Sequence, residues 1–175
     1  MIEIVPATTA EHFAQFQELV DELMAWDSAM SREIGLNLDT MLDFFYKKPP
    51  AALAAEFSPN GHVFLAKYEG RLAGCGALKE LSRDAAELTR VYVRPAFRGK
   101  GLGKAIVDAV IASARQEGYA TVRLETAIFM KDAHSLYRSF GFELSEPFRR
   151  VPDDLKHAEV FMELKLRGPA PTSAS

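Results

Sequence analysis

The chain has 175 residues, with 24 acidic and 21 basic side chains, so its formal net charge at neutral pH is −3. Hydrophobic residues make up 48% of the sequence and charged residues 26%, a composition that excludes disorder over most of the chain. The length suits one domain. The mildly acidic balance argues against a protein that coats nucleic acid or an anionic membrane, because both need an excess of basic residues.

The cysteine and histidine content limits the compartment and the chemistry. The single cysteine, Cys75, cannot form an intramolecular disulfide, which predicts a reducing compartment. The N-terminus lacks the basic segment of a secretory signal, and no apolar run reaches the roughly 20 residues needed to span a bilayer. The four histidines lack metal-ligand spacing. We therefore expect a cytoplasmic protein with no metal site and no nucleic-acid or membrane partner.

The first quarter of the chain predicts a strand followed by two helices. Residues 3–5 alternate in polarity and stop at Pro6, which suits a short strand at the edge of a sheet. Thr8 or Thr9 could cap a helix with an apolar stripe, and residues 38–46 predict a second helix that Pro49 and Pro50 close. The stripe consists of Phe13, Phe16, Val20, Leu23 and Met30.

The next segment predicts an antiparallel meander of three strands over residues 62–68, 72–81 and 86–93. Turn residues at positions 59–61 precede the first strand, and Glu69-Gly70 predicts a hairpin turn after it. Gly74 and Gly76 within the second strand indicate a bulge or a close approach of another part of the backbone.

The second half of the chain predicts alternating helices and strands. Pro95 ends the third strand of the meander, and a glycine-rich loop then opens a helix that ends near Gly118. A strand over residues 121–126 should be parallel to 86–93, because a helix connects the two. A short helix over 131–140, a strand near 142–144 and a last strand over 159–166 follow. We expect one domain over residues 1–166 and a disordered tail over 167–175.

The glycine-rich loop carries most of the functional information. Gly99, Gly101 and Gly103 let backbone N–H groups converge at a helix N-terminus, where the helix dipole favours an anion. Five basic residues and no acidic residue lie between positions 88 and 107. They are Arg90, Arg94, Arg98, Lys100 and Lys104. The loop therefore predicts a phosphate site, but the spacing matches neither a P-loop nor a dinucleotide-binding fingerprint.

Two motifs resemble one family. The run Arg98-Gly99-Lys100-Gly101-Leu102-Gly103 matches the Q/R-x-x-G-x-G/A signature of the GCN5-related N-acetyltransferase (GNAT) family, and the strand before it, residues 87–95, is similar as well. About forty residues downstream, Ala133 to Phe142 is similar to the family's A-x-x-L-Y-x-x-x-G-F segment. The resemblance covers about residues 1–166. It implies an α/β fold with a mixed, mainly antiparallel sheet, flanked by helices and splayed between strands 86–93 and 121–126.

The resemblance also implies a cosubstrate, acetyl-coenzyme A (acetyl-CoA), and the residues that bind it. Backbone groups of Val91, Tyr92 and Val93 would pair with the pantetheine arm and polarise the thioester. The loop and the helix start would hold the pyrophosphate through Arg98, Gly99, Lys100, Gly101, Leu102, Gly103 and Lys104. One position departs from the family pattern, because Met130 stands where many members have an asparagine that contacts the cofactor.

Acetyl transfer to an amine needs a proton acceptor for the amine and a proton donor for the departing thiolate. The resemblance makes Tyr137 the candidate acid, and the alternative is a tyrosine whose ring packs in the core. Glu87 is the candidate base, directly or through water, with Glu125 on the neighbouring strand in reserve; an ordinary solvated carboxylate is the alternative for Glu87. Cys75 is expected to be a buried core residue and not a nucleophile.

The function expected from the sequence is N-acetylation of a primary amine on a small molecule or amino acid. No activated nucleophile is apparent, so direct transfer in a ternary complex is preferred over an acyl-enzyme. The alternative is a non-catalytic acetyl-CoA or CoA sensor with the same fold; a phosphate-binding regulator of nucleic acid is a weaker rival. The first two helices and residues 145–157 should shape the acceptor site. Trp26, Met24 and Met30 could line it or belong to the core. A homodimer is compatible with these expectations.

Overall fold

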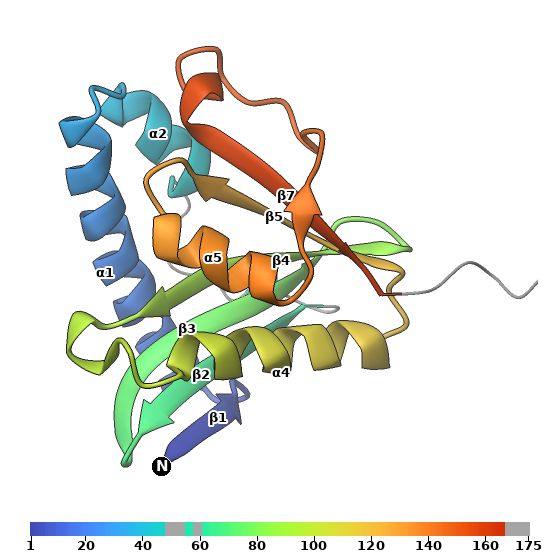
Figure 1. The fold of residues 1–175 in the computed structure, drawn as a ribbon. Coiled ribbons are helices and arrows are strands. Elements are labelled where there is room, and N and C mark those ends of the chain that lie inside the picture. The colour runs from blue at the N-terminus through green and yellow to red at the C-terminus, as the bar shows by residue number, and fades with distance from the viewer. Residues whose placement is uncertain (48–54, 58–60, 167–175) are drawn as a thin grey trace, which may run out of the picture.

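The computed structural model describes residues 1–47, 55–57 and 61–166. Their strands form one seven-stranded sheet in the order β1-β2-β3-β4-β5-β7-β6 (Figure 1). Within the described residues, β4 and β5 are the only parallel pair. The expected mixed, mainly antiparallel sheet is therefore confirmed. The strands are β1 (Ile2–Pro6), β2 (His62–Tyr68), β3 (Arg71–Glu80), β4 (Ala85–Val93), β5 (Thr121–Ala127), β6 (Glu143–Leu144) and β7 (Glu159–Lys165).

The helices begin and end at residues whose side chains or backbone suit those positions. Thr9 caps the first helix by accepting a hydrogen bond from the His12 N–H at 3.1 Å. Asn37 caps the second through the Thr40 N–H at the same distance. Gly118, with φ +83°, follows the end of the long helix after the glycine loop, as predicted. The helices are α1 (Ala10–Glu33), α2 (Leu38–Phe45), α4 (Leu102–Gln116) and α5 (Lys131–Ser139), with 3-10 turns at Pro95–Phe97 and Lys156–Ala158.

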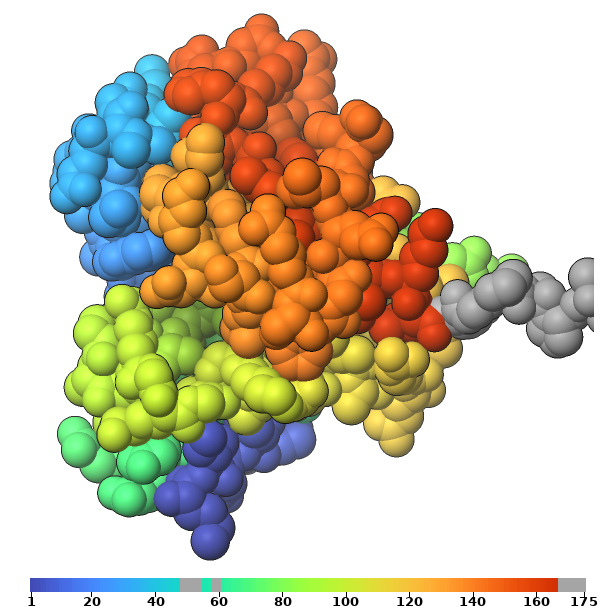
Figure 2. Space-filling model, in the orientation of Figure 1, coloured from blue at the N-terminus to red at the C-terminus, as the bar shows by residue number. Residues whose placement is uncertain are grey.

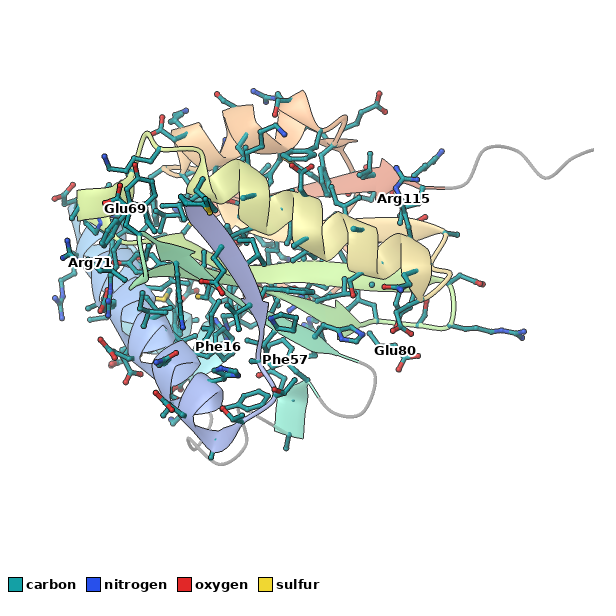
Figure 3. The ribbon with its side chains drawn as sticks, turned by 90° about the horizontal axis from the view of Figure 1, so that it is seen from below. Phe16, Phe57, Glu69, Arg71, Glu80 and Arg115 are labelled. Carbon is teal, nitrogen blue, oxygen red and sulfur yellow. The ribbon has the colours of Figure 1, made fainter. Side chains whose placement is uncertain are left out.

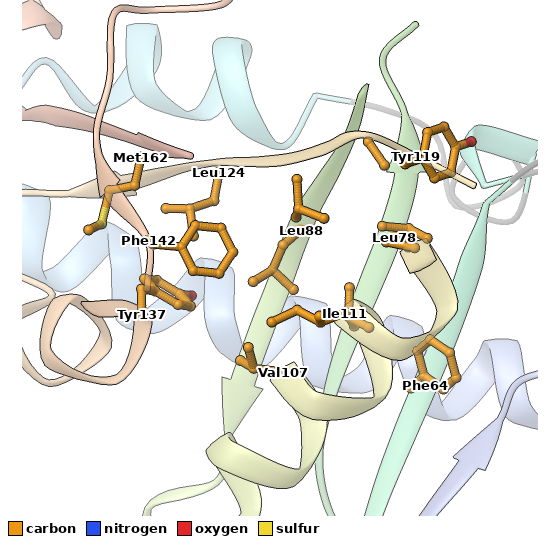
Figure 4. Packing of buried hydrophobic residues seen from close by; sticks show 14 residues of the cluster. Phe64, Leu78, Leu88, Val107, Ile111, Tyr119, Leu124, Tyr137, Phe142 and Met162 are labelled. Atoms are coloured by element: carbon orange, nitrogen blue, oxygen red, sulfur yellow. The ribbon is translucent and has the colours of Figure 1, made fainter. Parts of the chain in front are cut away.

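The sheet lies between two helical layers. Helices α1 and α2 cover one face, and α4 and α5 cover the other (Figures 1 and 3). On the α1 side, the rings of Phe16 and Phe57 meet edge to face at 5.7 Å between centroids (Figure 3). On the α4 side, the largest cluster joins Val107 and Ile111 to strand residues such as Leu88 and Leu124 (Figure 4). The alternation of side chains along each strand supplies both apolar faces.

The two strand glycines of β3 allow α4 to lie close to the sheet. A Cβ atom on Gly76 would come within 2.3 Å of Ile106 Cγ2, and one on Gly74 would come within 2.4 Å of the Tyr92 carbonyl oxygen. The pairing of β3 with β4 also shifts register between Cys75 and Ala77. The predicted bulge and the predicted close approach are both present.

The parallel strands β4 and β5 diverge along their length. They pair only at their first residues, from Ala85 opposite Thr121 to Glu87 opposite Arg123. Beyond that point β4 continues to Val93 and β5 to Ala127 without pairing to each other. This is the splay that the resemblance to the GNAT family implied, and it opens the sheet at the carboxyl ends of the two strands.

A few boundaries differ from the expectations. Strand β1 includes Pro6, which pairs with Phe64; β1 is an edge strand, where a missing N–H donor is tolerated. The predicted Pro49-Pro50 helix end, the turn residues Pro59 and Asn60 and the tail 167–175 lie outside the described residues. None of the helices in the described part of the chain combines the length and apolar character needed to cross a membrane.

Candidate active site

A cavity of about 470 Å³ opens between the glycine loop, the start of α4 and the start of α5. We call it the loop cavity. Figure 2 shows the loop and the start of α4, in yellow-green, beside α5, in orange, on one face of the molecule. Gly103 brings the two helices together, since a Cβ atom there would lie 3.2 Å from Leu136 Cδ2. Leu136 itself lines the cavity, so this contact forms part of its wall.

The loop has the backbone conformation of an anion site. Gly99 and Gly101 have φ values of +74° and +86°, in the region that side-chain-bearing residues rarely adopt. Gly101 is the N-cap of α4, and no side chain of the described residues caps the helix there. The N–H groups of the first helical turn therefore remain available to a ligand. This geometry fits a pyrophosphate such as that of acetyl-CoA.

Most of the predicted cofactor residues come together in the loop cavity, and two do not. The predicted cofactor residues that line it are Val91, Tyr92, Val93, Arg98, Gly99, Gly101, Leu102 and Gly103. Lys104 is exposed and pairs instead with Asp108 at 2.9 Å, one turn along α4. The Lys100 ammonium lies 5.1 Å from the centre of the Tyr68 ring, on the side of β2.

Three of the five cations grouped in the sequence point in different directions. The guanidinium of Arg94 is held by Glu18 and Glu22 of α1, with Glu22 at 2.8 Å. Arg90 has φ +55° beside the register shift, and its guanidinium donates to the Phe45 carbonyl oxygen at 2.7 Å. Arg98 lines the loop cavity. The cluster in sequence is therefore divided in space, because α2, α1 and the loop cavity each hold one of the three guanidinium groups.

A second cavity, of about 140 Å³, lies between the sheet and the helices α1 and α2. We call it the carboxylate cavity, because its charged lining contains five carboxyl groups and three cations. Glu87, the predicted base, is buried there and pairs with Arg149 at 2.5 Å. Arg149 Nε also lies 3.3 Å from Glu125 Oε2. The carboxyl groups are those of Asp27, Glu56, Glu87, Glu125 and Glu159, and the cations are Lys79, Arg90 and Arg149.

Burial perturbs several of these acids. It raises the pKa values of Glu125 and Glu159, and the mutual repulsion of the two carboxyls raises the pKa of Glu159 further. Burial also raises the pKa of Asp27, although the Tyr46 hydroxyl donates a hydrogen bond to Asp27 at 2.8 Å and lowers it in part. Perturbed carboxyls in a cavity are typical of functional sites.

Tyr137 reaches the carboxylate cavity from the opposite face of the sheet. Its ring belongs to the cluster under α4 and α5, 5.8 Å from the ring of Phe142 (Figure 4). The same residue lines the carboxylate cavity together with Glu87. The splay of β4 and β5 makes this possible, because unpaired strands leave the sheet open at that level. Burial raises the pKa of Tyr137, so its hydroxyl keeps its proton near neutral pH.

The two cavities adjoin. Leu23, Val91, Phe129 and Met130 line both. Met130, the departure from the family pattern, accepts a hydrogen bond from the Thr126 hydroxyl through its sulfur at 3.3 Å. A ligand in the loop cavity can therefore present a group at this junction to a second ligand in the carboxylate cavity.

Trp26, an aromatic candidate for the acceptor site, does not line the carboxylate cavity. Trp26 lines the loop cavity and meets Phe129 edge to face at 5.7 Å. Met24 and Met30 are not among the described residues that line either cavity. Sequence reasoning also missed Asp27, Arg149 and Glu159. The only signal for Arg149 was its place in the segment 145–157, which was expected to shape the acceptor site.

Comparison with known proteins decides the family. Residues 18–142 match the model of the acetyltransferase (GNAT) family. The chain belongs to the GNAT family. It is 38% identical over 91 residues to the uncharacterized N-acetyltransferase YjgM of Escherichia coli, a match that covers 50% of this chain and 54% of that protein. It is also 38% identical over 107 residues to the uncharacterized N-acetyltransferase YsnE of Bacillus subtilis, covering 59% and 70%.

Solved GNAT structures share the fold over nearly the whole chain. The structure of yncA from Salmonella typhimurium, determined with its cofactor acetyl-CoA, matches with a TM-score of 0.70 and 21% identity, over 99% of each chain. The paia N-acetyltransferase from Thermoplasma acidophilum, in complex with coenzyme A, matches with a TM-score of 0.71 and 22% identity, over 94% of this chain and 99% of that one. At these identities the likeness shows the fold.

Proposed function

We propose that this GNAT protein transfers the acetyl group of acetyl-CoA directly to the primary amine of a small molecule or amino acid, within a ternary complex. The observation that carries the proposal is the pair of adjoining cavities, one built around an anion-binding loop and the other lined by carboxyl groups. Acetyl-CoA would supply the acetyl thioester in the first cavity, and the amine would occupy the second.

The loop cavity has the groups that the cosubstrate requires. N–H groups at the start of α4 would bind the pyrophosphate, with Gly99 and Gly101 giving it close access to the backbone. Val91 to Val93 lie where β4 has separated from β5, so one edge of this segment can pair with the pantetheine arm. An N–H group of the same segment would stabilise the negative charge that develops on the carbonyl oxygen. Lys100 and Lys104 would contribute charge from the surface.

The carboxylate cavity supplies the proton acceptor. Holding an amine of pKa about 10.4 in its neutral form near pH 7.4 costs about 4 kcal/mol, at 1.36 kcal/mol for each pKa unit. A carboxylate beside the amine offsets this cost by taking the proton. Glu87 and Glu125 both line the cavity and are the two candidates. Tyr137, which keeps its proton because of burial, would donate a proton to the departing thiolate.

Two features support direct transfer to a small acceptor. Cys75, the single cysteine, is buried, and burial raises its pKa, so its thiol is not an activated nucleophile. Residues of α1, of α2 and of the segment around Arg149 line the carboxylate cavity. A cavity of about 140 Å³ favours a small molecule over the side chain of a folded protein.

The test is a thiol-release assay with acetyl-CoA and a panel of primary amines and amino acids, combined with calorimetric binding of acetyl-CoA. We expect saturable thiol release with at least one acceptor and an acetylated amine as the product. Binding of acetyl-CoA without turnover on any acceptor would contradict the proposal and support the alternative of a non-catalytic sensor. Absence of acetyl-CoA binding would contradict both.

A further inference from the structure

Glu125 and Glu159 lie on the same face of the β5–β7 pair. In the antiparallel register Glu125 is opposite Phe161 and Glu159 is opposite Ala127, so the two glutamates are diagonal neighbours on adjacent strands. Long side chains in this relation can touch. Both glutamates line the carboxylate cavity. The sheet therefore brings two acidic groups together in one wall of the proposed acceptor site.

Glu125 is buried with few groups that can stabilise its charge. Its side chain is 3% exposed, and among the described residues no N–H group donates a hydrogen bond to either carboxylate oxygen. Arg149 Nε lies near one oxygen, at 3.3 Å, as an ion pair, and the carboxyl of Glu159 lowers the pKa of Glu125 in part by hydrogen bonding to it. A buried carboxylate with so few hydrogen bonds is costly. A positively charged group with several N–H donors would relieve that cost, and an ammonium ion is such a group.

The cations that line the cavity are already engaged with other groups. Arg149 Nη2 lies 2.5 Å from Glu87, and Lys79 Nζ lies 2.8 Å from Glu56. Arg90 donates to a backbone carbonyl and stacks on the ring of Tyr46, with its guanidinium carbon 4.9 Å from the ring centre. The described residues contain no ion pair between a cation and Glu159.

The remaining titratable groups facing the pair are Asp27 from α1, Tyr46 after α2 and Tyr137 from α5. The charge of Asp27 adds to the rise in the pKa of Glu159. With every group in its usual ionised form, the lining has five negative and three positive charges, which leaves an excess of two negative charges. One proton held between Glu125 and Glu159 removes part of this excess when the cavity is empty.

We propose that the Glu125–Glu159 pair binds the acceptor as an ammonium ion and takes its proton, an inference that rests on the proposed function. The acceptor is a small primary amine with no carboxylate beside the amine, because a carboxylate would add to the negative charge of the cavity. Binding of the ammonium ion displaces the shared proton to solvent. One N–H bond of the ammonium ion then breaks, its electron pair stays on nitrogen, and an O–H bond forms on the carboxyl pair. The neutral amine attacks the thioester carbon.

Glu87 is less suited to this role. Its carboxylate is already in a direct ion pair with Arg149, and that contact must break before an incoming ammonium ion can replace it. Glu87 is then a neighbour that holds Arg149 in place, and the proton acceptor comes from β5 and β7.

The first test needs no substrate. Carbon-13 labelling of the glutamate side chains allows the carboxyl of Glu159 to be titrated by NMR in the wild type, Glu125→Gln and the control Glu163→Gln. Glu163 lies on the same strand as Glu159 and outside the cavity lining. Because Glu125 raises the pKa of Glu159, we expect the midpoint of Glu159 to fall by about one unit in Glu125→Gln and to stay unchanged in Glu163→Gln. An unchanged midpoint in both variants would show that Glu125 and Glu159 do not interact, and would overturn the proposal.

The second test measures amine binding by calorimetry, with coenzyme A present, in two buffers of different ionisation enthalpy. The probes are benzylamine and phenylglycine, which is benzylamine with a carboxylate on the carbon that bears the amine. We expect benzylamine to release a proton on binding and to bind at least tenfold more tightly than phenylglycine. We also expect Glu125→Gln and Glu159→Gln to weaken benzylamine at least tenfold relative to Glu163→Gln. Any smaller ratio would overturn the proposal, and the comparison of the two probes needs no variant.

Thiol release recorded on the same proteins separates this proposal from the proposed function. Benzylamine binding that depends on the pair, without thiol release, would contradict acetyl transfer and leave the ammonium site standing. Thiol release with benzylamine that both glutamine variants retain would contradict the role of the pair and leave acetyl transfer standing.

Discussion

The loop cavity and the carboxylate cavity share four wall residues, yet they are built in different ways. The loop cavity draws nine of its lining residues from one segment, 91–103, so its chemistry can be predicted from a local motif. The carboxylate cavity takes its charged residues from α1, β3, β4, β5, β7 and the segments between the elements, with one or two residues from each. The comparison indicates that the proposed cosubstrate site is fixed by local sequence and the proposed acceptor site by tertiary packing.

The largest expected effect concerns the loop cavity. Gly101→Glu places a side chain at a residue with φ +86° and adds a negative charge where the pyrophosphate would bind. We expect the affinity for acetyl-CoA, measured by calorimetry, to fall by at least about 100-fold, or about 2.7 kcal/mol. Gly70→Glu is the matched control, because Gly70 has φ +75° and lies in the hairpin between β2 and β3. Equal affinity in the two variants would contradict the proposal that the glycine loop binds the pyrophosphate of acetyl-CoA.

The next effect concerns the junction of the two cavities. Tyr137→Phe removes the hydroxyl that would protonate the thiolate and leaves the ring packed beside Phe142. We expect kcat to fall by about 100-fold, with the affinity for acetyl-CoA unchanged. Tyr119→Phe alters another buried tyrosine, one that lines neither cavity in the described residues. A kcat for Tyr137→Phe within threefold of that control would show that Tyr137 is a packing residue.

Much of the fold, and half of the site, could be predicted from sequence because the signals are local. Thr9 and Asn37 cap helices, Gly118 ends one, and the Glu69-Gly70 turn separates the first two strands of the meander. The loop glycines indicate an anion site for the same reason. Arg149 and Glu159 could not be predicted, because nothing near them in sequence indicates that they meet Glu125. For Arg90 and Arg94 the sequence was misleading in the other direction. They are close in sequence, which suggested one phosphate site, but their guanidinium groups bind to different parts of the structure.

Arg149→Gln tests whether the carboxylate cavity acts as one electrostatic unit. The positive charge of Arg149 lowers the pKa of Glu125, so its removal raises that pKa. If the Glu125–Glu159 pair accepts the proton, kcat/KM for the amine rises with pH as the pair loses its proton. We expect Arg149→Gln to move this rise to higher pH by about one unit. Arg150→Gln, at the exposed neighbouring residue, should leave the profile in place.

The smallest expected effect is on stability. The pKa of Glu159 is higher in the folded chain than the usual value of about 4.3, so the folded state binds more protons than the unfolded state above that pH. Its contribution to stability is therefore present at low pH and is lost as pH rises through the folded pKa. We expect Glu159→Gln to raise Tm by about 2–4 °C at pH 9, with no change at pH 4. A lower Tm at pH 9 would contradict this sign.

The most direct measurement of the central claim uses both cavities at once. Wild-type protein is incubated with acetyl-CoA and benzylamine, and mass spectrometry follows the amine while a thiol reagent follows coenzyme A. The two-cavity account predicts N-acetylbenzylamine and free thiol in equal amounts, at rates that saturate with each substrate. Thiol release without acetylated amine, or acetyl-CoA binding with neither product from any primary amine, would contradict it.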